Sequence, residues 1–456
     1  MAESTLHTRP LGGAGQLAVD SLALTDAHAV PGLYLEESAL ATLSINAGAT
    51  AIPVFIGRFH ELDGTLASSE TCIAITSYVH FQRRFSAAMR ATVTLDPTPR
   101  VSTDRALGAF AVRHYFDNGG GRCYVLPVPA LDDGDALLAL PSRIARCAEI
   151  SLYCYTEQDG TEAVVYAALE PLLQETGGGL LIANSADGVT RPTTTAQRTA
   201  VYHPGVVTPY EVLPADDQVS LPPADDLPAR TLADLRATEP LRYLELRRAV
   251  DEWFKVNYPV VALNASAAVA GVYCQIDRRK GVWAAPAGVL LNKVSGLHNP
   301  GSASVQMRLM ANRINALKDF PEEGVRVWGA RTMVDPLSSP WLNVAVSRLF
   351  DAAARDLRQA LRFAVFLPNN ETTWSAVRNA LRSYLQRLWR EGGLHGATSD
   401  EAFYVQVGAG VSMTAAQIDS GLLVVRVGMA PVRALEFIEI VFTEQLTSAL
   451  ASADPS

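Results

Sequence analysis

The sequence predicts a multi-domain protein of mixed α/β class, and three observations support this prediction. The chain has 456 residues, which is too long for one ordinary hydrophobic core. Strand-like and helix-like stretches alternate along most of its length. The composition, with 48% apolar and 19% charged residues, is that of a folded globular protein.

The first part of the chain begins with small residues and continues as α/β alternation. Residues 1–30 are rich in Gly, Ala, Ser and Thr, so we expect a flexible arm there. The apolar patterns then predict strands at 31–38, 51–59, 123–128 and 179–184, and helices at 104–117 and 164–175.

The middle of the chain contains a proline-rich segment. Eight prolines crowd residues 186–240, which we interpret as a long insertion or surface excursion outside the core. Beyond it the patterns predict helices at 231–257, 267–280 and 302–319, with a strand at 259–266.

The C-terminal part of the sequence, from position 325 onward, carries the clearest patterns. Apolar residues spaced by three and four predict helices at 341–362 and 371–391, the second capped by Asn370 and ended by Gly392 and Gly393. Strands are predicted at 325–333, 363–370, 401–407, 421–428 and 435–444.

The glycine run Gly119–Gly121 raises the question of a phosphate-binding loop. Such loops follow a strand and precede a helix, because the helix N-terminus offers free N–H groups and a positive dipole. Here the order is helix, glycines, strand, so we expect Asn118 and Gly119 to end a helix, where a positive φ is common. The run Gly177–Gly179 has the same order. We interpret His114, on the apolar face of the first helix, as a core or rim residue.

No other motif indicates a catalytic site, a metal site or a cofactor. The sequence has no nucleophile-elbow or SxxK motif, and its eight histidines lack metal-ligand spacing. Its five cysteines have no CxxC pair, which is typical of reduced thiols. Acidic pairs at 132–133, 225–226 and 322–323 lie in Pro/Gly-rich stretches and are interpreted as solvated turns. Catalytic carboxylates that converge only in space stay an open alternative.

Charge and hydropathy exclude two classes of partner. The net charge is −9 and no run of five Lys or Arg occurs, so nucleic-acid binding is not expected. No apolar run is long enough to cross a bilayer as a helix, so direct membrane insertion is not expected either. The first residues lack the charged-then-apolar pattern of a secretory signal.

Arginines concentrate in the two predicted C-terminal helices. Residues 341–395 contain eight arginines and four acidic residues, in contrast to the negative charge of the whole chain. Two interpretations stay open: an ordinary solvated helix face, or a docking face for an acidic partner surface. The docking candidates, spaced at helical intervals, are Arg355, Arg358, Arg362, Arg378, Arg382, Arg387 and Arg390.

Nine short stretches, in order along the chain, together resemble contractile tail sheath proteins. That family builds the outer tubes of myophages, R-type pyocins and extracellular contractile injection particles. The Pro-rich segment 186–240 has no counterpart in the pattern. The stretches are PGLYLEE (31–37), IPVFIGRF (52–59), FDNGGGRCYVLPV (116–128), WAAPAG (283–288), VWGART (327–332), LPNN-x-x-x-W (367–374), LRSYLQRLWREGGLHG (381–396), DEAFYVQV (400–407) and GLLVVRVGMAPVRALEFIEIVF (421–442).

The resemblance implies a domain organisation and a linkage between subunits. It implies an N-terminal arm and linking strand (1–35), an outer α/β domain (36–325) containing the insertion, and an inner C-terminal domain (326–456). The two terminal strand-like segments, which have no nearby hairpin partner in the sequence, would pair with neighbouring subunits. The linking residues would be Leu33, Tyr34, Leu35, Phe437, Ile438, Ile440 and Phe442.

The function implied is that of a structural sheath subunit without catalytic activity, cofactor or metal. It would polymerise as hexameric rings around an inner tube and contract to drive the tube through a target envelope. Its partners would be copies of itself, the inner tube protein, baseplate and terminator proteins, and paralogous sheath proteins in some particles. Assembly would take place in the bacterial cytoplasm, with release as part of a phage tail or tail-like particle. The alternatives are a non-contractile structural tube or capsid-type protein and, less in keeping with the motifs, an α/β enzyme.

Overall fold

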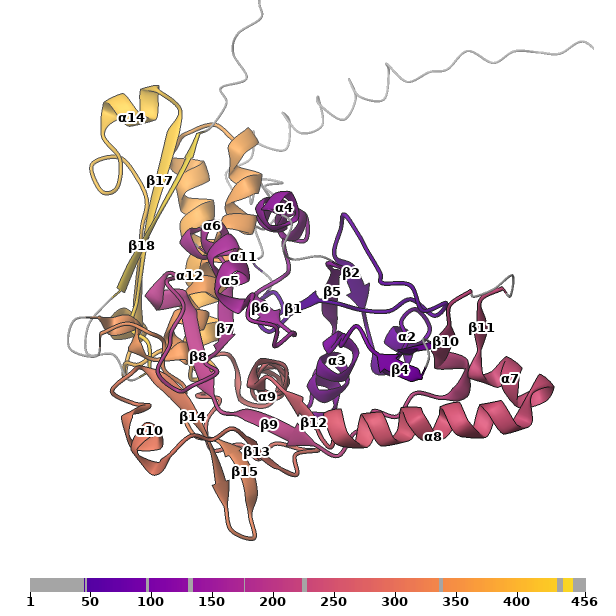
Figure 1. The fold of residues 1–456 in the computed structure, drawn as a ribbon. Helices are drawn as coiled ribbons and strands as arrows, with labels where there is room; N and C mark the ends of the chain where they lie inside the picture. Colours follow the sequence, from indigo (N-terminus) through magenta and orange to yellow (C-terminus); the bar gives the residue numbers. More distant parts are fainter. Residues whose placement is uncertain are drawn as a thin grey trace, which may run out of the picture. The chain divides into compact units, whose positions relative to one another are not determined.

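The computed structural model describes residues 45, 47–95, 98–129, 134–175, 177–223, 228–335, 339–432 and 438–445. All of them belong to one compact unit, residues 44–456. Figure 1 shows its mixture of sheets and covering helices, which confirms the predicted α/β class.

An eight-stranded sheet forms the centre of the described fold. Its spatial order is β15-β14-β8-β7-β6-β1-β5-β2, with parallel pairing from β14 to β5 and antiparallel pairing at both ends. Its parallel strands are mostly buried on both faces, as their apolar sequences require. The strands are β1 (Pro53–Gly57), β2 (Ile73–Ile75), β5 (Cys123–Pro127), β6 (Leu152–Tyr155), β7 (Leu180–Asn184), β8 (Thr199–His203), β14 (Ile314–Phe320) and β15 (Gly324–Val327).

Helices cover both faces of this sheet. One apolar cluster joins alternate strand residues to α3 (Gly108–Asp117) and α9 (Ala265–Lys280), and includes Phe55 and Tyr115. A second cluster joins the opposite residues to α4 (Gly134–Ala145), α5 (Glu162–Ala168) and α6 (Glu170–Gln174), and includes Val54 and Tyr166. The predicted helix 164–175 is therefore two short helices that meet at Leu169.

The interpretation of residues 186–240 as lying outside the core is wrong for β8. This strand lies between β7 and β14, and every one of its residues is buried. Pro192 and Pro204 flank the strand instead of interrupting it. The high proline content of residues 186–240 taken together therefore led to the wrong prediction for this short core strand. The rest of the segment contributes η1 (Ala196–Arg198), β9 (Gly205–Thr208), η2 (Asp216–Gln218), β10 (Val219–Leu221), β11 (Arg230–Thr231) and α7 (Leu232–Thr238).

Two smaller sheets adjoin the central one. One has the order β11-β10-β3-β4, with β3 (Ala91–Leu95) and β4 (Pro99–Ser102), and packs against α8 (Pro240–Asn257). The other has the order β12-β9-β13, with β12 (Val261–Leu263) and β13 (Gly296–His298). The short helix α2 (Tyr78–Gln82) follows β2.

The predicted helix at 302–319 is only partly correct. A helix, α10 (Ala303–Arg308), covers its beginning, but residues 314–320 form β14 in parallel pairing with β8. Arg313 has a φ of 59°, which ends the helical path, and burial of Ile314 and Leu317 beside β8 favours the strand.

The C-terminal part agrees closely with its sequence patterns. Helices α11 (Val344–Leu361) and α12 (Glu371–Arg390) lie where predicted, and the Asn370 side chain accepts from the N–H of Thr373 as the α12 cap. The strand expected at 363–370 is wrong, because the 3₁₀ helix η4 (Arg362–Phe366) continues directly from α11. A 3₁₀ turn, η3 (Pro340–Leu342), precedes α11, and the remaining helices are α13 (Ser399–Ala402) and α14 (Ala415–Asp419).

Candidate functional site

A three-stranded antiparallel sheet at the C-terminus is the first candidate surface. Its order is β16 (Phe403–Gln406), β17 (Leu422–Met429), β18 (Ile438–Gln445). Strand β18 pairs with β17 along its whole length, from Ile438 opposite Met429 to Gln445 opposite Leu422. The expectation that this terminal strand has no partner within its own chain is therefore wrong, because β17 turns back and supplies one.

The outer edge of β18 is nevertheless open among the described residues. The structure gives β18 one strand partner, β17, so its outer edge pairs with no other strand of the described chain. The Phe442 side chain is buried, opposite Val425. Leu33, Tyr34, Leu35 and Phe437 lie outside the described residues, and of Ile438 and Ile440 only the backbone pairing is described.

The predicted docking arginines divide into two groups. Arg355 donates to the carbonyl oxygen of Gly178 (3.1 Å), and Arg378 donates to that of Val407 (2.7 Å), so both support the fold from within. Arg382 pairs with Asp400 at 3.4 Å on the surface, and the exposed Arg387 donates to the Ile45 carbonyl oxygen (2.9 Å). The seven arginines therefore do not form one solvated stripe.

The remaining three candidates lack an ion-pair partner in the described part of the chain. They are Arg358, which is half-buried, and Arg362 and Arg390, which are exposed. Sequence spacing alone could not separate the two groups, because the carbonyl that holds Arg355 lies far away along the chain, at Gly178.

Buried ion pairs join α11 to η1, which directly precedes β8, and to α9. Arg198 makes a bidentate contact with Asp351 (2.8–3.1 Å), and Arg348 makes one with Asp277 of α9 (2.6 and 3.0 Å). All four side chains are buried, with exposed fractions between 4% and 9%. Such pairs fix geometry more than they add stability, because desolvation offsets much of their attraction.

The segment that precedes β1 is held by the same two C-terminal helices. The Gly48 N–H donates to Asp356 of α11 (3.1 Å), and Tyr384 of α12 donates its hydroxyl to the same carboxylate (2.8 Å). Burial raises the pKa of Tyr384, so its hydroxyl stays protonated and remains a donor. Arg387 adds its hydrogen bond to Ile45. Ile45 and Gly48 are thus attached to α12 and α11 before the chain enters the central sheet.

The topological switch point of the central sheet is filled by the chain itself. The switch lies between β1 and β6, where doubly wound proteins bind anionic ligands. Here the Glu157 carboxylate, fully buried, accepts from the N–H groups of Arg58 (3.0 Å) and Leu107 (2.9 Å). Burial raises the pKa of this carboxyl. A Cβ on Gly57 would lie 2.8 Å from its oxygen, so glycine is required at that position.

The interpretations of Gly119 as part of a helix terminus and of His114 as a core or rim residue are both confirmed. Helix α3 ends at Asp117 and Gly119 has a φ of 92°, as expected for a helix terminus. His114 is fully buried, with Nε2 3.1 Å from the Asn292 carbonyl oxygen, and burial lowers its pKa to about 4.

Comparisons with known proteins identify the family. Residues 338–443 match the family model of the phage tail sheath C-terminal domain. The chain is 33% identical to a protein of the anti-feeding prophage helical sheath in its contracted state, covering 91% of this chain and 99% of that one, with a TM-score of 0.67. The chain belongs to the contractile tail sheath family.

Two further structures support this assignment. A chain in the anti-feeding prophage baseplate is 34% identical, with 91% and 99% coverage and a TM-score of 0.66. A chain of the contracted sheath complex of PVC, an extracellular contractile injection system, is 29% identical, with 91% and 97% coverage and a TM-score of 0.61. No curated protein sequence matches the chain. This chain is therefore a structural subunit of a contractile sheath in a phage tail-like particle.

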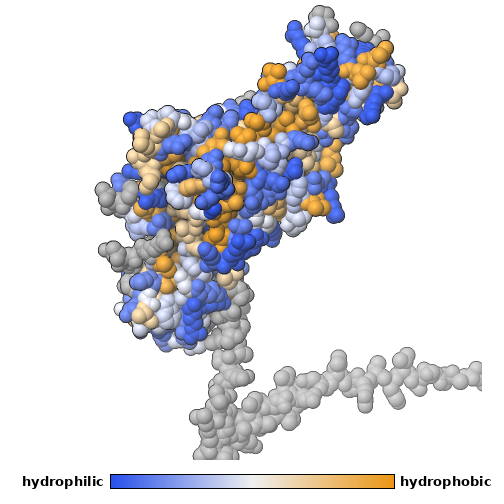
Figure 2. Space-filling view, turned by 90° about the horizontal axis from the view of Figure 1, so that it is seen from below, coloured by the Kyte–Doolittle hydropathy of each residue, from blue (hydrophilic) through white to orange (hydrophobic). Residues whose placement is uncertain are grey.

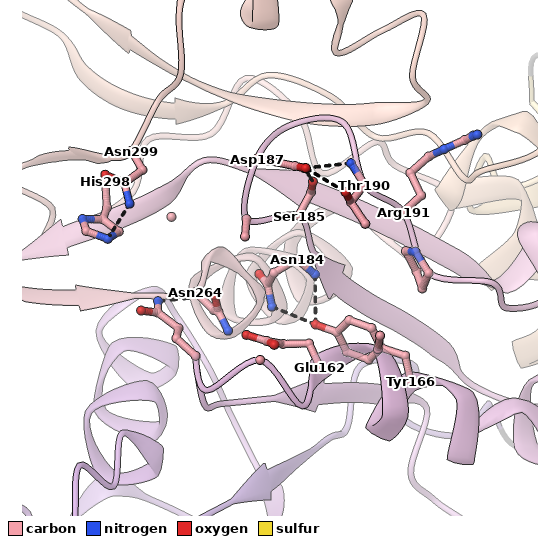
Figure 3. Close-up of a pocket in the computed structure, with 16 residues that line it drawn as sticks. Glu162, Tyr166, Asn184, Ser185, Asp187, Thr190, Arg191, Asn264, His298 and Asn299 are labelled. Carbon is pink, nitrogen blue, oxygen red and sulfur yellow. Dashed lines mark hydrogen bonds between the residues drawn. The ribbon is translucent and has the colours of Figure 1, made fainter.

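A polar cavity lies beside the sheath subunit's central sheet, and several of its polar side chains bond to one another. It encloses about 450 Å³ beyond the carboxyl ends of β6 and β7 (Figure 3). Asp187 accepts from Thr190 N (2.7 Å) and Thr190 Oγ1 (2.7 Å), and Asn184 bonds to Tyr166. Burial opposes ionisation of Asp187, but these hydrogen bonds hold the pKa of its carboxyl below the usual range. The Asp187 carboxylate thus stabilises the local turn between Asp187 and Thr190.

No helix in the described ranges is long and apolar enough to span a membrane. Over the same ranges, no group of three or more His, Cys, Asp or Glu is placed to hold a metal ion.

Proposed function

We propose that this sheath subunit assembles with copies of itself as stacked hexameric rings around an inner tube. The extended lattice is metastable, and the contracted lattice buries more surface between outer domains and has the lower free energy. Release at the baseplate spreads along the sheath, because the shift of each subunit biases its linked neighbours. The contraction drives the tube through a target envelope.

The observation that carries this proposal is the outer edge of β18, which pairs with no other strand among the described residues. An exposed edge strand is normally a liability, since it offers unpaired N–H and C=O groups to another chain. In a sheath subunit the same edge becomes an adhesive by strand addition. Each backbone hydrogen bond contributes about 0.5–1.5 kcal/mol, so several of them, with buried apolar side chains, link two copies firmly. The proposed linking partners are Leu33, Tyr34 and Leu35 of one copy and residues 437–442 of another.

Deleting residues 1–38 tests this linkage. We expect the variant to fold with an unchanged thermal unfolding midpoint and to form no rings or tubes in electron micrographs. A second variant, Leu33→Asp with Leu35→Asp, keeps the length of the arm but removes the apolar side of the strand. It should fail to assemble in the same way. Tubes of normal length and connectivity from either variant would contradict the linkage.

The proposed contacts with the inner tube are the arginines that make no ion pair, or only a surface ion pair, in the described chain. Arg358, Arg362 and Arg390 have no ion-pair partner in the described chain, and Arg382 makes a single surface pair. Exposed pairs contribute about 0–1 kcal/mol each, which suits a surface that must template assembly and then slip. Arg355 and Arg378 are left out of this proposal because they serve the fold, and Arg387 because it holds Ile45.

The double variant Arg382→Glu with Arg390→Glu tests tube docking. We expect a folded protein whose co-assembly with tubes yields fewer and shorter sheaths, because two exposed attractions become repulsions. Arg83→Glu with Arg146→Glu, at two exposed positions away from α8 and α12, provides a control with the same charge change. Sheaths of normal yield from the α12 variant, measured by electron microscopy, would refute the docking role.

Exposed apolar residues support packing between outer surfaces. Figure 2 shows apolar side chains gathered on the face seen from below, where α8 and α10 lie. Leu241, Leu244 and Val256 of α8 and Met307 of α10 are all more than half exposed. Apolar groups of this kind mark surfaces that meet a partner.

The proposed partners are copies of this chain, an inner tube protein, and baseplate and terminator proteins, together with paralogous sheath proteins where a particle has them. The work is done by stored lattice energy, so the proposal requires no catalytic site and no cofactor. Assembly is placed in the bacterial cytoplasm, with the particle released afterwards.

A further inference from the structure

Three of the stretches that carry the family resemblance meet at one surface cavity. It encloses about 630 Å³, and its lining includes Trp283 and Ala285 of WAAPAG, Ala330 of VWGART, and Val432 just after β17. The beginning of α11 closes another side with Ala345. Stretches that lie far apart in the sequence thus share a place that the proposed strand linkage does not explain.

The charged residues that line this cavity in the described part of the chain are both positive. They are Lys280 and Arg331, both exposed, and none of the described lining residues is acidic. In the part of the chain that the structure describes, neither side chain has an ion-pair partner. Lys280 ends α9, where the helix dipole favours a cation, but Arg331 lies on no helix. Two cations beside one cavity create a site that attracts an anionic group.

The remaining lining suits a polypeptide better than a compact small ion. Small alanine side chains leave room for a backbone to approach, and the cavity volume is that of several residues. Trp283 forms a fixed wall: a Cβ on Gly393, at the end of α12, would lie 2.9 Å from its ring. We call this site, defined by Lys280, Trp283, Arg331 and the alanines beside them, the basic cavity.

We propose that the basic cavity receives the acidic residues Glu36 and Glu37 from the N-terminal segment of a neighbouring copy. This rests on the proposed function, in which that segment reaches a neighbour. PGLYLEE belongs to the same set of family stretches as the residues lining the cavity, and its acidic pair directly follows the strand-like residues. The two carboxylates supply the ion-pair partners that Lys280 and Arg331 lack among the described residues. The contact would fix the register of the added strand, which backbone pairing alone leaves free to slip.

A charge-reversal cycle in the full-length chain tests this contact. Lys280→Glu with Arg331→Glu should raise the critical concentration for assembly by about tenfold or more, because attraction becomes repulsion. Glu36→Lys with Glu37→Lys should do the same. Combining the four substitutions should restore most of the assembly, measured by sedimentation of sheath polymers. Because successive residues of a strand face opposite sides, Glu36→Lys and Glu37→Lys are also made singly to find which carboxylate carries the contact.

Controls separate this inference from folding and from the strand linkage. Arg279→Glu with Arg146→Glu makes the same charge change as the double cavity variant, at exposed residues that do not line the cavity, and should assemble normally. Thermal unfolding establishes that each variant is folded. The inference is overturned if reversal of the cavity leaves assembly unchanged, if the combined variant is not restored, or if Asp225→Lys with Asp226→Lys restores it instead. If the deletion of residues 1–38 itself leaves the lattice intact, the strand linkage fails as well.

Discussion

The edges of two sheets in this molecule are treated in opposite ways. The outer edge of β15 in the central sheet is covered by residues 288–291, which exchange backbone hydrogen bonds with Val325 and Val327 (2.7–3.0 Å). The outer edge of β18 has no such cover in the described chain. In the described chain one edge is thus covered and the other is not, and an uncovered edge strand is a template for pairing with another chain.

The interiors of the two regions differ in a related way. The central sheet is stabilised by two apolar clusters, and at its topological switch point the Glu157 carboxylate accepts hydrogen bonds from backbone N–H groups. The C-terminal part is attached to it through buried ion pairs on α11. The described central sheet is therefore held by its own apolar packing, whereas the C-terminal part is joined to it by charged contacts.

Breaking the ion pair between the two regions should have the largest effect. Asp351→Ala leaves the buried Arg198 guanidinium without its carboxylate, and we expect the free energy of unfolding to fall by about 4 kcal/mol. Replacing both residues by apolar ones, Asp351→Leu with Arg198→Met, should cost much less. Glu252→Ala in the exposed pair with Arg248 is the control and should cost under about 0.5 kcal/mol. Urea denaturation measures all three, and equal losses at the buried and exposed pairs would contradict this view of the join.

Removing the switch-point carboxylate should have the next largest effect. Glu157→Ala leaves two buried N–H groups unpaired, and we expect a loss of about 3 kcal/mol in the free energy of unfolding. Formate is small enough to enter the vacated space and should recover part of the loss, whereas chloride at the same ionic strength should not. The wild-type chain, whose site is filled, should show no such difference. A variant as stable as wild type, or one indifferent to formate, would mean that Glu157 does not satisfy these groups.

The free energy of unfolding should depend on pH because His114 is buried in the core of the central region. The pKa of His114 is about 4 when folded and near 6.5 when unfolded, so the unfolded chain binds a proton that the folded chain excludes. Stability is therefore lost as the pH falls through this window, by about 2.5 kcal/mol between pH 7 and pH 4.5. His114→Gln should reduce the pH dependence by that amount. Urea denaturation at each pH measures the free energy of unfolding. If its pH dependence is the same in the variant as in wild type, the imidazole of His114 is solvated in the folded chain.

The sequence predicted those elements whose pattern is local. Helices α11 and α12 and strands β1, β5 and β17 follow from apolar spacing and caps, because each buries a regular face. β8 and β14 were missed or misassigned because their strand character comes from pairing with each other across a long separation in the chain. The hydrogen-bond partners of Arg355 and Arg387 could not be predicted either. Both are backbone carbonyl oxygens, which every residue has, so no sequence pattern distinguishes them.

A cryo-electron microscopy structure of the assembled sheath, resolved at the outer edge of β18, tests the central claim most directly. We expect a strand from a second copy of this chain to be hydrogen-bonded along residues 438–445, with its side chains packed beside Phe442. A lattice in which that edge faces solvent, or is covered by a segment of its own chain, would contradict it.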